Sequence, residues 1–130
     1  VRAGMWAEVR SDIAAVTSIA KPRGITTKVI FETSYLMPEA IAACTECCIE
    51  AEADFVKTST GFGGEGATEA GVRTMLETAR GRIKVKPSGG IRDRERAELF
   101  VGMGAERLGV GFSSCAVICG TAEAASGTGY

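Results

Sequence analysis

The chain has 130 residues, and its 15 basic and 16 acidic side chains give a formal net charge of −1 at pH 7. This mixture of both signs lacks the basic footprint that nucleic-acid-binding proteins carry. Hydrophobic residues make up 45% of the chain, enough for a packed core, and no apolar run approaches the roughly 20 residues of a membrane span.

The chain contains no histidine and five cysteines. The lack of histidine removes Ser-His and Cys-His nucleophile pairs and every metal site that needs an imidazole. An odd number of cysteines in an α/β pattern, without a signal-peptide layout, favours reduced thiols and a cytoplasmic protein. Lysine-based covalent chemistry is among the few nucleophilic reactions that remain.

Alternating helices and strands are predicted along the chain, which is typical of an α/β protein with a parallel sheet. Apolar residues at helical spacing predict a first helix over residues 1–20, ended by Pro22 and Gly24. Apolar and β-branched runs predict four strands, near residues 28–33, 54–60, 83–87 and 107–112.

A helix is expected after each strand. Pro38 suits the first turn of one helix, and Thr68 and Asp93 are candidate N-caps for the next two. A short helix is expected from Ser113 to about Cys119. Residues 120–130 are small, polar and glycine-rich, so we expect a flexible tail there.

Three cysteines share one helix and form a CxxC pattern: Cys44, Cys47 and Cys48. Such spacing can hold a metal or a redox pair. The same positions, however, belong to a helix face that favours small apolar residues, and no further ligand is evident. We therefore expect these thiols to pack in the core.

Lys57 lies in the middle of the predicted strand 54–60 and is followed by hydroxyl residues and glycines. A buried lysine loses its proton more easily, and the free amine is then a nucleophile; a lysine that reaches back to water is the alternative. Lys86 repeats the pattern on the next strand. Adjacent parallel strands lie about 4.8 Å apart, so two like charges there should lower the pKa of one of them.

The segments KVIFET, DFVKTSTGF, VKPSGGIR and RLGVGFSS, in that order, resemble the 2-deoxyribose-5-phosphate aldolases, which are class I aldolases of the (βα)8-barrel type. A complete TIM barrel needs roughly 250 residues. The resemblance therefore implies the C-terminal half, (βα)4, of such a barrel over residues 1–119. It also implies an enzyme of nucleotide catabolism that reversibly cleaves 2-deoxy-D-ribose 5-phosphate to D-glyceraldehyde 3-phosphate and acetaldehyde, without a metal or an organic cofactor.

The resemblance assigns the Schiff base to Lys57, and pKa tuning and proton transfer to Lys86. Some family members end in a tyrosine that assists proton transfer, and this chain ends in Tyr130, although a terminal tyrosine can also be accidental. Phosphate binding is implied for eight positions: Gly61, Gly89, Gly90, Ile91, Arg92, Gly111, Ser113 and Ser114. Glycines allow backbone N–H groups to approach an anion; the alternative is that they only form tight turns.

Two departures from the family are visible. The family's proton-relaying aspartate on the fourth barrel strand has no counterpart, and Glu32 is a weak substitute. Glu52 stands where the family has a helix-ending glycine, so either the helix ends differently or a left-handed residue costs on the order of 1 kcal/mol.

Half a barrel leaves sheet edges uncovered, so we expect self-association or a complementary half-barrel. Two rivals to the aldolase interpretation remain. One is another phosphosugar-handling barrel, such as an isomerase. The other is a catalytically impaired phosphate-binding half-barrel or assembly module.

Overall fold

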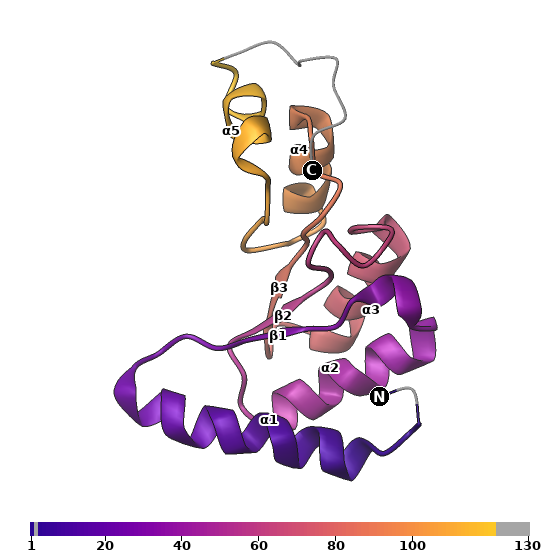
Figure 1. The fold of residues 1–130 in the computed structure, drawn as a ribbon, viewed down its shortest axis with the longest axis vertical. Helices are drawn as coiled ribbons and strands as arrows, with labels where there is room; N and C mark the ends of the chain where they lie inside the picture. Colours follow the sequence, from indigo (N-terminus) through magenta and orange to yellow (C-terminus); the bar gives the residue numbers. More distant parts are fainter. Residues whose placement is uncertain (2, 122–130) are drawn as a thin grey trace.

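A computed structural model describes residue 1 and residues 3–121. Its centre is a parallel sheet with the strand order β1 (Lys28–Ile30), β2 (Phe55–Lys57) and β3 (Lys84–Lys86) (Figure 1). Every strand is joined to the next by a segment that contains a helix, as parallel pairing requires. The fold is therefore an α/β fold with a parallel sheet, as predicted.

The described residues contain five α-helices: α1 (Trp6–Ala20), α2 (Pro38–Glu50), α3 (Glu69–Ala79), α4 (Arg94–Gly102) and α5 (Phe112–Ile118). Helix α2 packs between α1 and α3, and α4 contacts α5 beyond the ends of the strands (Figure 1). None of the described helices is both long enough and apolar enough to cross a membrane.

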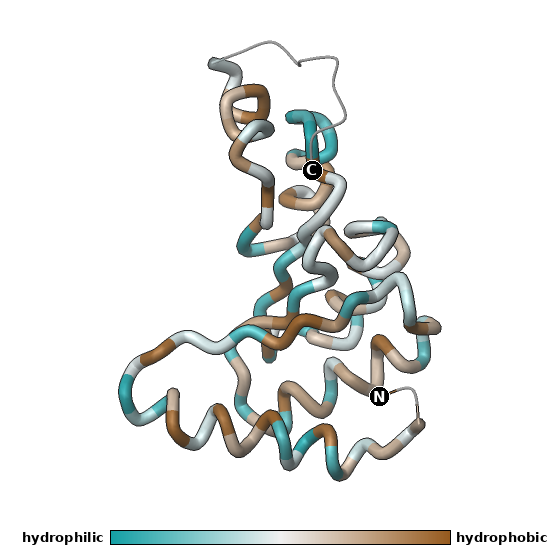
Figure 2. The backbone as a smooth tube through the Cα atoms, viewed as in Figure 1, coloured by the Kyte–Doolittle hydropathy of each residue, from teal (hydrophilic) through white to brown (hydrophobic). Residues whose placement is uncertain are grey.

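The two faces of the sheet have different environments. Val56 and Val85 are fully buried and belong to the core that also contains Met75 and Phe100. Because side chains alternate along a strand, the lysines of β2 and β3 lie on the opposite face. Polar positions accordingly interrupt the apolar ones along the chain (Figure 2).

Two of the predicted N-caps are confirmed. The Thr68 hydroxyl accepts a hydrogen bond from the Gly71 N–H at 3.1 Å, and the Asp93 carboxylate accepts one from the Arg96 N–H at 2.8 Å. Pro38 is the first residue of α2, as its fixed φ favours.

Glu52 follows the end of α2 with φ of +56°, so the chain accepts the left-handed conformation without a glycine. Its carboxylate pairs with the Lys21 ammonium at 2.5 Å, on the surface.

The predicted fourth strand, 107–112, is wrong in extent. Only one parallel bridge forms, between Ser88 and Gly109. Gly109 donates its N–H to the Pro87 carbonyl oxygen at 2.8 Å, but Pro87 has no N–H with which to continue the ladder. The segment therefore runs beside β3 without becoming a regular strand.

Other boundaries also differ from the predictions. The first helix begins at Trp6 rather than at residue 1, because Gly4 takes φ of +70° and breaks the helical path. The last helix begins at Phe112, one residue before the predicted Ser113. Most of the predicted tail, residues 122–130, lies outside the described residues.

The cysteine-rich face of α2 is part of the core, as predicted. Cys44, Cys47 and Cys48 are buried at 2%, 6% and 0% exposure. Hydrogen bonding with Cys44 and burial both raise the pKa of the Cys48 thiol, so this group stays protonated. Among the described residues no cluster of acids and thiols could hold a metal ion.

Candidate active site

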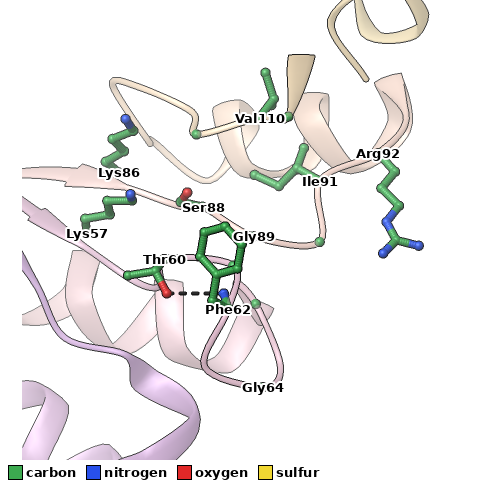
Figure 3. Close-up of a pocket in the computed structure, with 15 residues that line it drawn as sticks. Lys57, Thr60, Phe62, Gly64, Lys86, Ser88, Gly89, Ile91, Arg92 and Val110 are labelled. Atoms are coloured by element: carbon green, nitrogen blue, oxygen red, sulfur yellow. Dashed lines mark hydrogen bonds between the residues drawn. The ribbon is translucent and has the colours of Figure 1, made fainter. Parts of the chain in front are cut away.

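A cavity of about 490 Å³ lies at the carboxyl ends of β2 and β3 (Figure 3). In open parallel sheets and barrels alike, this end of the strands is where ligands bind. Three segments contribute its walls, at residues 57–66, 86–92 and 109–111. Six of the predicted site residues line it together with the two lysines: Gly61, Gly89, Gly90, Ile91, Arg92 and Gly111.

Lys57 and Lys86 are direct neighbours across the parallel ladder. Both are half-buried, and both side chains lie at the same end of the cavity (Figure 3). The two lysines are therefore neighbours in one cavity, and their roles in a shared active site stay a prediction.

The pKa of Lys86 is lowered from its ordinary value of 10.5, first by burial and then by the charge of Lys57. More distant contributions come from Lys28 and Arg107. The sequence predicts both causes, burial for Lys57 and the like charge for the pair, and at Lys86 the loss of hydration is the larger of the two. At a given pH, a larger fraction of Lys86 is therefore unprotonated than of a free lysine.

Two glycine-rich loops meet at the other end of the cavity. Gly61, Gly89 and Gly90 have φ of +97°, +86° and +72°, values that side chains rarely adopt. A Cβ on Gly66 would lie only 2.3 Å from the backbone of Gly89, so the loops touch through their main chains. Ala67 N–H also donates to the Gly89 carbonyl oxygen at 3.0 Å. The glycines therefore allow the two loops to pack main chain against main chain, and they also permit the positive φ values of the turns.

Thr58 fastens one loop to the neighbouring strand. Its buried hydroxyl donates to the Ser88 carbonyl oxygen at 3.0 Å and accepts from the Ser88 N–H at 2.9 Å. Ser88 directly precedes Gly89, so this pair of bonds holds the start of the glycine loop. Nothing in the local sequence beyond the hydroxyl itself indicates this role.

Three predicted residues are placed less centrally, and a fourth, Tyr130, is not among the residues that the structure describes. Arg92 lines the cavity but is exposed, and its side chain extends away from the lysine pair (Figure 3). Ser113 and Ser114 are in the first turn of α5 and are not among the cavity-lining residues.

Several lining residues were not predicted, although all but two of them fall within the segments that carried the resemblance: Thr60, Phe62, Gly64, Gly66, Ser88, Gly109 and Val110. The aromatic ring of Phe62 is 80% exposed and stands at the lip of the cavity (Figure 3). Phe112, at 96% exposure, begins the helix that follows the cavity segment. Both residues follow a glycine in the sequence, which is the signal that could have indicated them.

A parallel α/β sheet with two neighbouring lysines at its carboxyl end and a glycine cradle beside them defines a barrel-type, lysine-based class of site. The model of the DeoC/LacD family aldolases matches residues 3–114. The chain belongs to this family.

Relatives at the level of sequence and structure agree with this assignment. The chain is 46% identical over 109 residues to deoxyribose-phosphate aldolase 2 of Oceanobacillus iheyensis, covering 84% of this chain and 48% of that protein. It superposes on the aldolase QR15 with a TM-score of 0.81 and 42% identity, covering 92% of this chain and 52% of that one. The deoxyribose phosphate aldolase of Aeropyrum pernix, described as a tetramer, gives a TM-score of 0.77 at 31% identity and covers 86% and 47%. The chain thus spans about half the length of the relatives it matches, and its fold is that of half a TIM barrel.

Proposed function

We propose that this chain supplies the lysine and phosphate sites of an aldolase that reversibly cleaves 2-deoxy-D-ribose 5-phosphate. The observation that carries this proposal is the in-register pair Lys57 and Lys86 at one end of a cavity whose other end is a glycine cradle. A substrate with an aldehyde at one end and a phosphate at the other matches that arrangement. Family membership supports the aldolase class of reaction.

The proposed reaction begins with attack of the neutral Lys57 amine on the C1 aldehyde, after which uptake of one proton and loss of water give an iminium ion. Removal of the proton from the 3-hydroxyl then breaks the C2–C3 bond, and the electron pair moves into the iminium to form an enamine. Glyceraldehyde 3-phosphate leaves. Protonation of the enamine at C2 and hydrolysis release acetaldehyde, so no redox cofactor is consumed.

Lys86 is the proposed proton carrier beside Lys57. Its lowered pKa, caused mainly by burial, makes both its charged and neutral forms accessible nearer to neutral pH. The two amines lie side by side at the same end of the cavity, so either could be the nucleophile on geometry alone. Trapping of the Schiff base decides between them.

The phosphate is proposed to lie in the cradle of Gly61, Gly89 and Gly90, where main-chain N–H groups can approach an anion. Ile91 and Gly111 complete the wall. Arg92 is a proposed long-range attractant for the phosphate.

The family resemblance also implies phosphate binding by Ser113 and Ser114 and proton transfer by Tyr130, and we propose these roles here. If Ser113 and Ser114 bind the phosphate, the first turn of α5 must move toward the cavity when phosphate binds. Tyr130 is proposed to assist protonation of the enamine.

The proposed partner is a complementary half-barrel that covers the face of the sheet opposite Val56 and Val85. An identical copy of this chain is not the proposed partner on that face. That face carries five cations: Lys28, Lys57, Lys84, Lys86 and Arg107. The Lys84 Nζ lies 5.4 Å and the Arg107 Cζ lies 4.7 Å from the centre of the Phe55 ring. Neither cation forms an ion pair with a carboxylate of the described residues. Two such faces would repel each other, so the covering segment should carry carboxylates. Self-association is then expected through other surfaces.

A retro-aldol assay tests the proposed function. The assay measures release of glyceraldehyde 3-phosphate from 2-deoxyribose 5-phosphate by coupling it to NADH oxidation. We expect release from the parent chain assembled with the proposed complementary half-barrel, and no release from the Lys57→Leu variant. Phosphate binding without any release in the complemented chain would favour the impaired half-barrel.

A further inference from the structure

Glu32, two residues after the end of β1, adopts an unusual backbone conformation with φ of +54° and ψ of 64°. Among the described residues only Glu52 and Arg80 share a positive φ without being glycine. Glu52 and Arg80 follow the ends of α2 and α3, where a left-handed residue ends a helix. Glu32 follows a strand instead. Residues held in this region persist where the surroundings fix them, and they concentrate at functional sites.

The hydrogen bonds of the Glu32 carboxylate are made with Thr60. Thr60 begins the glycine-rich loop of residues 60–64, here called the 60–64 loop. One carboxylate oxygen accepts from the Thr60 hydroxyl at 2.6 Å and from the Thr60 N–H at 3.1 Å. The other oxygen lies 3.2 Å from the same N–H. The Thr60 hydroxyl in turn accepts from the Phe62 N–H at 3.2 Å. The carboxylate therefore holds the Thr60 N–H directly and the Phe62 N–H through the Thr60 hydroxyl.

The middle of the 60–64 loop rests on the same side chain. A Cβ on Gly63 would lie 2.6 Å from the Cγ and Cδ atoms of Glu32, so a larger residue there would displace the Glu32 side chain. The Ser34 hydroxyl, two residues after Glu32, donates to the Gly63 carbonyl oxygen at 2.9 Å. The end of β1 thus holds both the entry and the centre of the loop.

We propose that Glu32 is a positioning residue that holds the 60–64 loop in the conformation lining the cavity, and that its left-handed backbone is what aims the carboxylate at Thr60. Glu32 does not line the cavity, whereas Thr60, Gly61 and Phe62 do. A direct proton relay is less consistent with its contacts, because within the described chain no ion pair joins Glu32 to Lys57. The inference rests on the proposed function only where it concerns phosphate.

Amide hydrogen exchange on the unliganded protein tests the positioning role by itself. Glu32→Gly relieves the backbone strain but deletes the carboxylate, so exchange at the Thr60 and Phe62 amides should accelerate about tenfold or more, as expected for loss of charge-assisted bonds. Glu52→Gly is the matched control: it replaces the same residue type at the same left-handed φ, away from the cavity. Its exchange at Thr60 and Phe62 should equal that of the parent.

Binding of inorganic phosphate, followed by titration, extends the test to the cradle. Glu32→Gly should bind phosphate about tenfold more weakly than the parent. The affinity of Glu32→Gln should lie between the two, because its amide oxygen still accepts one hydrogen bond. The affinity of Glu52→Gly should equal that of the parent. If Glu32→Gly does not fold, Glu32→Gln carries the same comparison. Failure of the parent to bind phosphate would refute the proposed phosphate site, while the exchange rates still decide the role of Glu32. Parent-like exchange at Thr60 and Phe62 in the Glu32 variants would overturn the inference.

Discussion

Replacing Thr58 by valine keeps the shape of the side chain and removes one hydroxyl that makes two hydrogen bonds to Ser88. Thr58 is fully buried and Ser88 is 5% exposed, so water cannot readily replace either bond. Leaving a buried N–H and a buried C=O without partners costs about 1–3 kcal/mol each. The added methyl group returns up to about 1 kcal/mol of hydrophobic stabilisation. The net loss expected from Thr58→Val is therefore about 1–6 kcal/mol, against the roughly 5–15 kcal/mol that stabilises a domain.

Urea unfolding, followed by circular dichroism, measures this loss directly. Thr58→Ser is the matched control, because it retains the hydroxyl and removes only a methyl group, at a cost of about 1 kcal/mol. The valine variant should therefore unfold at lower urea concentration than the serine variant. If Thr58→Val is as stable as Thr58→Ser or more so, the two bonds to Ser88 do not hold the start of the Gly89 loop as argued.

Two further predictions concern titratable groups. Burial lowers the pKa of Lys86 below 10.5, so below that lowered pKa the charged lysine destabilises the fold, and the penalty disappears as the pH rises toward 10.5. Lys86→Met should consequently be more stable than the parent at pH 7 and should lose that advantage near pH 10.5 in pH-dependent unfolding; a variant less stable than the parent at pH 7 would contradict this. Of the five cysteines, only the exposed Cys115 and Cys119 should react rapidly with a thiol reagent in the native protein, and rapid modification of all five would disprove the buried cluster on α2.

The features that could be predicted from sequence are those with local causes. Helix starts at Pro38, Thr68 and Asp93 follow from a ring-fixed φ or a side-chain cap, which depend on residues within one turn. The alternation that puts Lys57 and Lys86 on one face of the sheet depends only on strand geometry. These local rules were sufficient to place the two lysines next to each other on neighbouring strands.

The features that could not be predicted depend on partners distant in the sequence. The segment 107–112 has the composition of a strand, but its pairing is limited by Pro87 on the neighbouring strand. Likewise, Glu32 was considered only as a substitute acid for proton transfer, because nothing near it in the sequence shows that Thr60 is its partner. Burial of Lys86, the main cause of its lowered pKa, also requires the assembled cavity.

Reductive trapping tests the central claim most directly. The protein, in complex with its complement, is incubated with acetaldehyde and borohydride, digested, and examined by mass spectrometry for an ethyl group on lysine. The label is predicted on Lys57, to be lost in Lys57→Leu and retained in Lys86→Leu. A label on Lys86 that survives in Lys57→Leu would reverse the two roles, and labelling of neither lysine would contradict the Schiff-base account of this site.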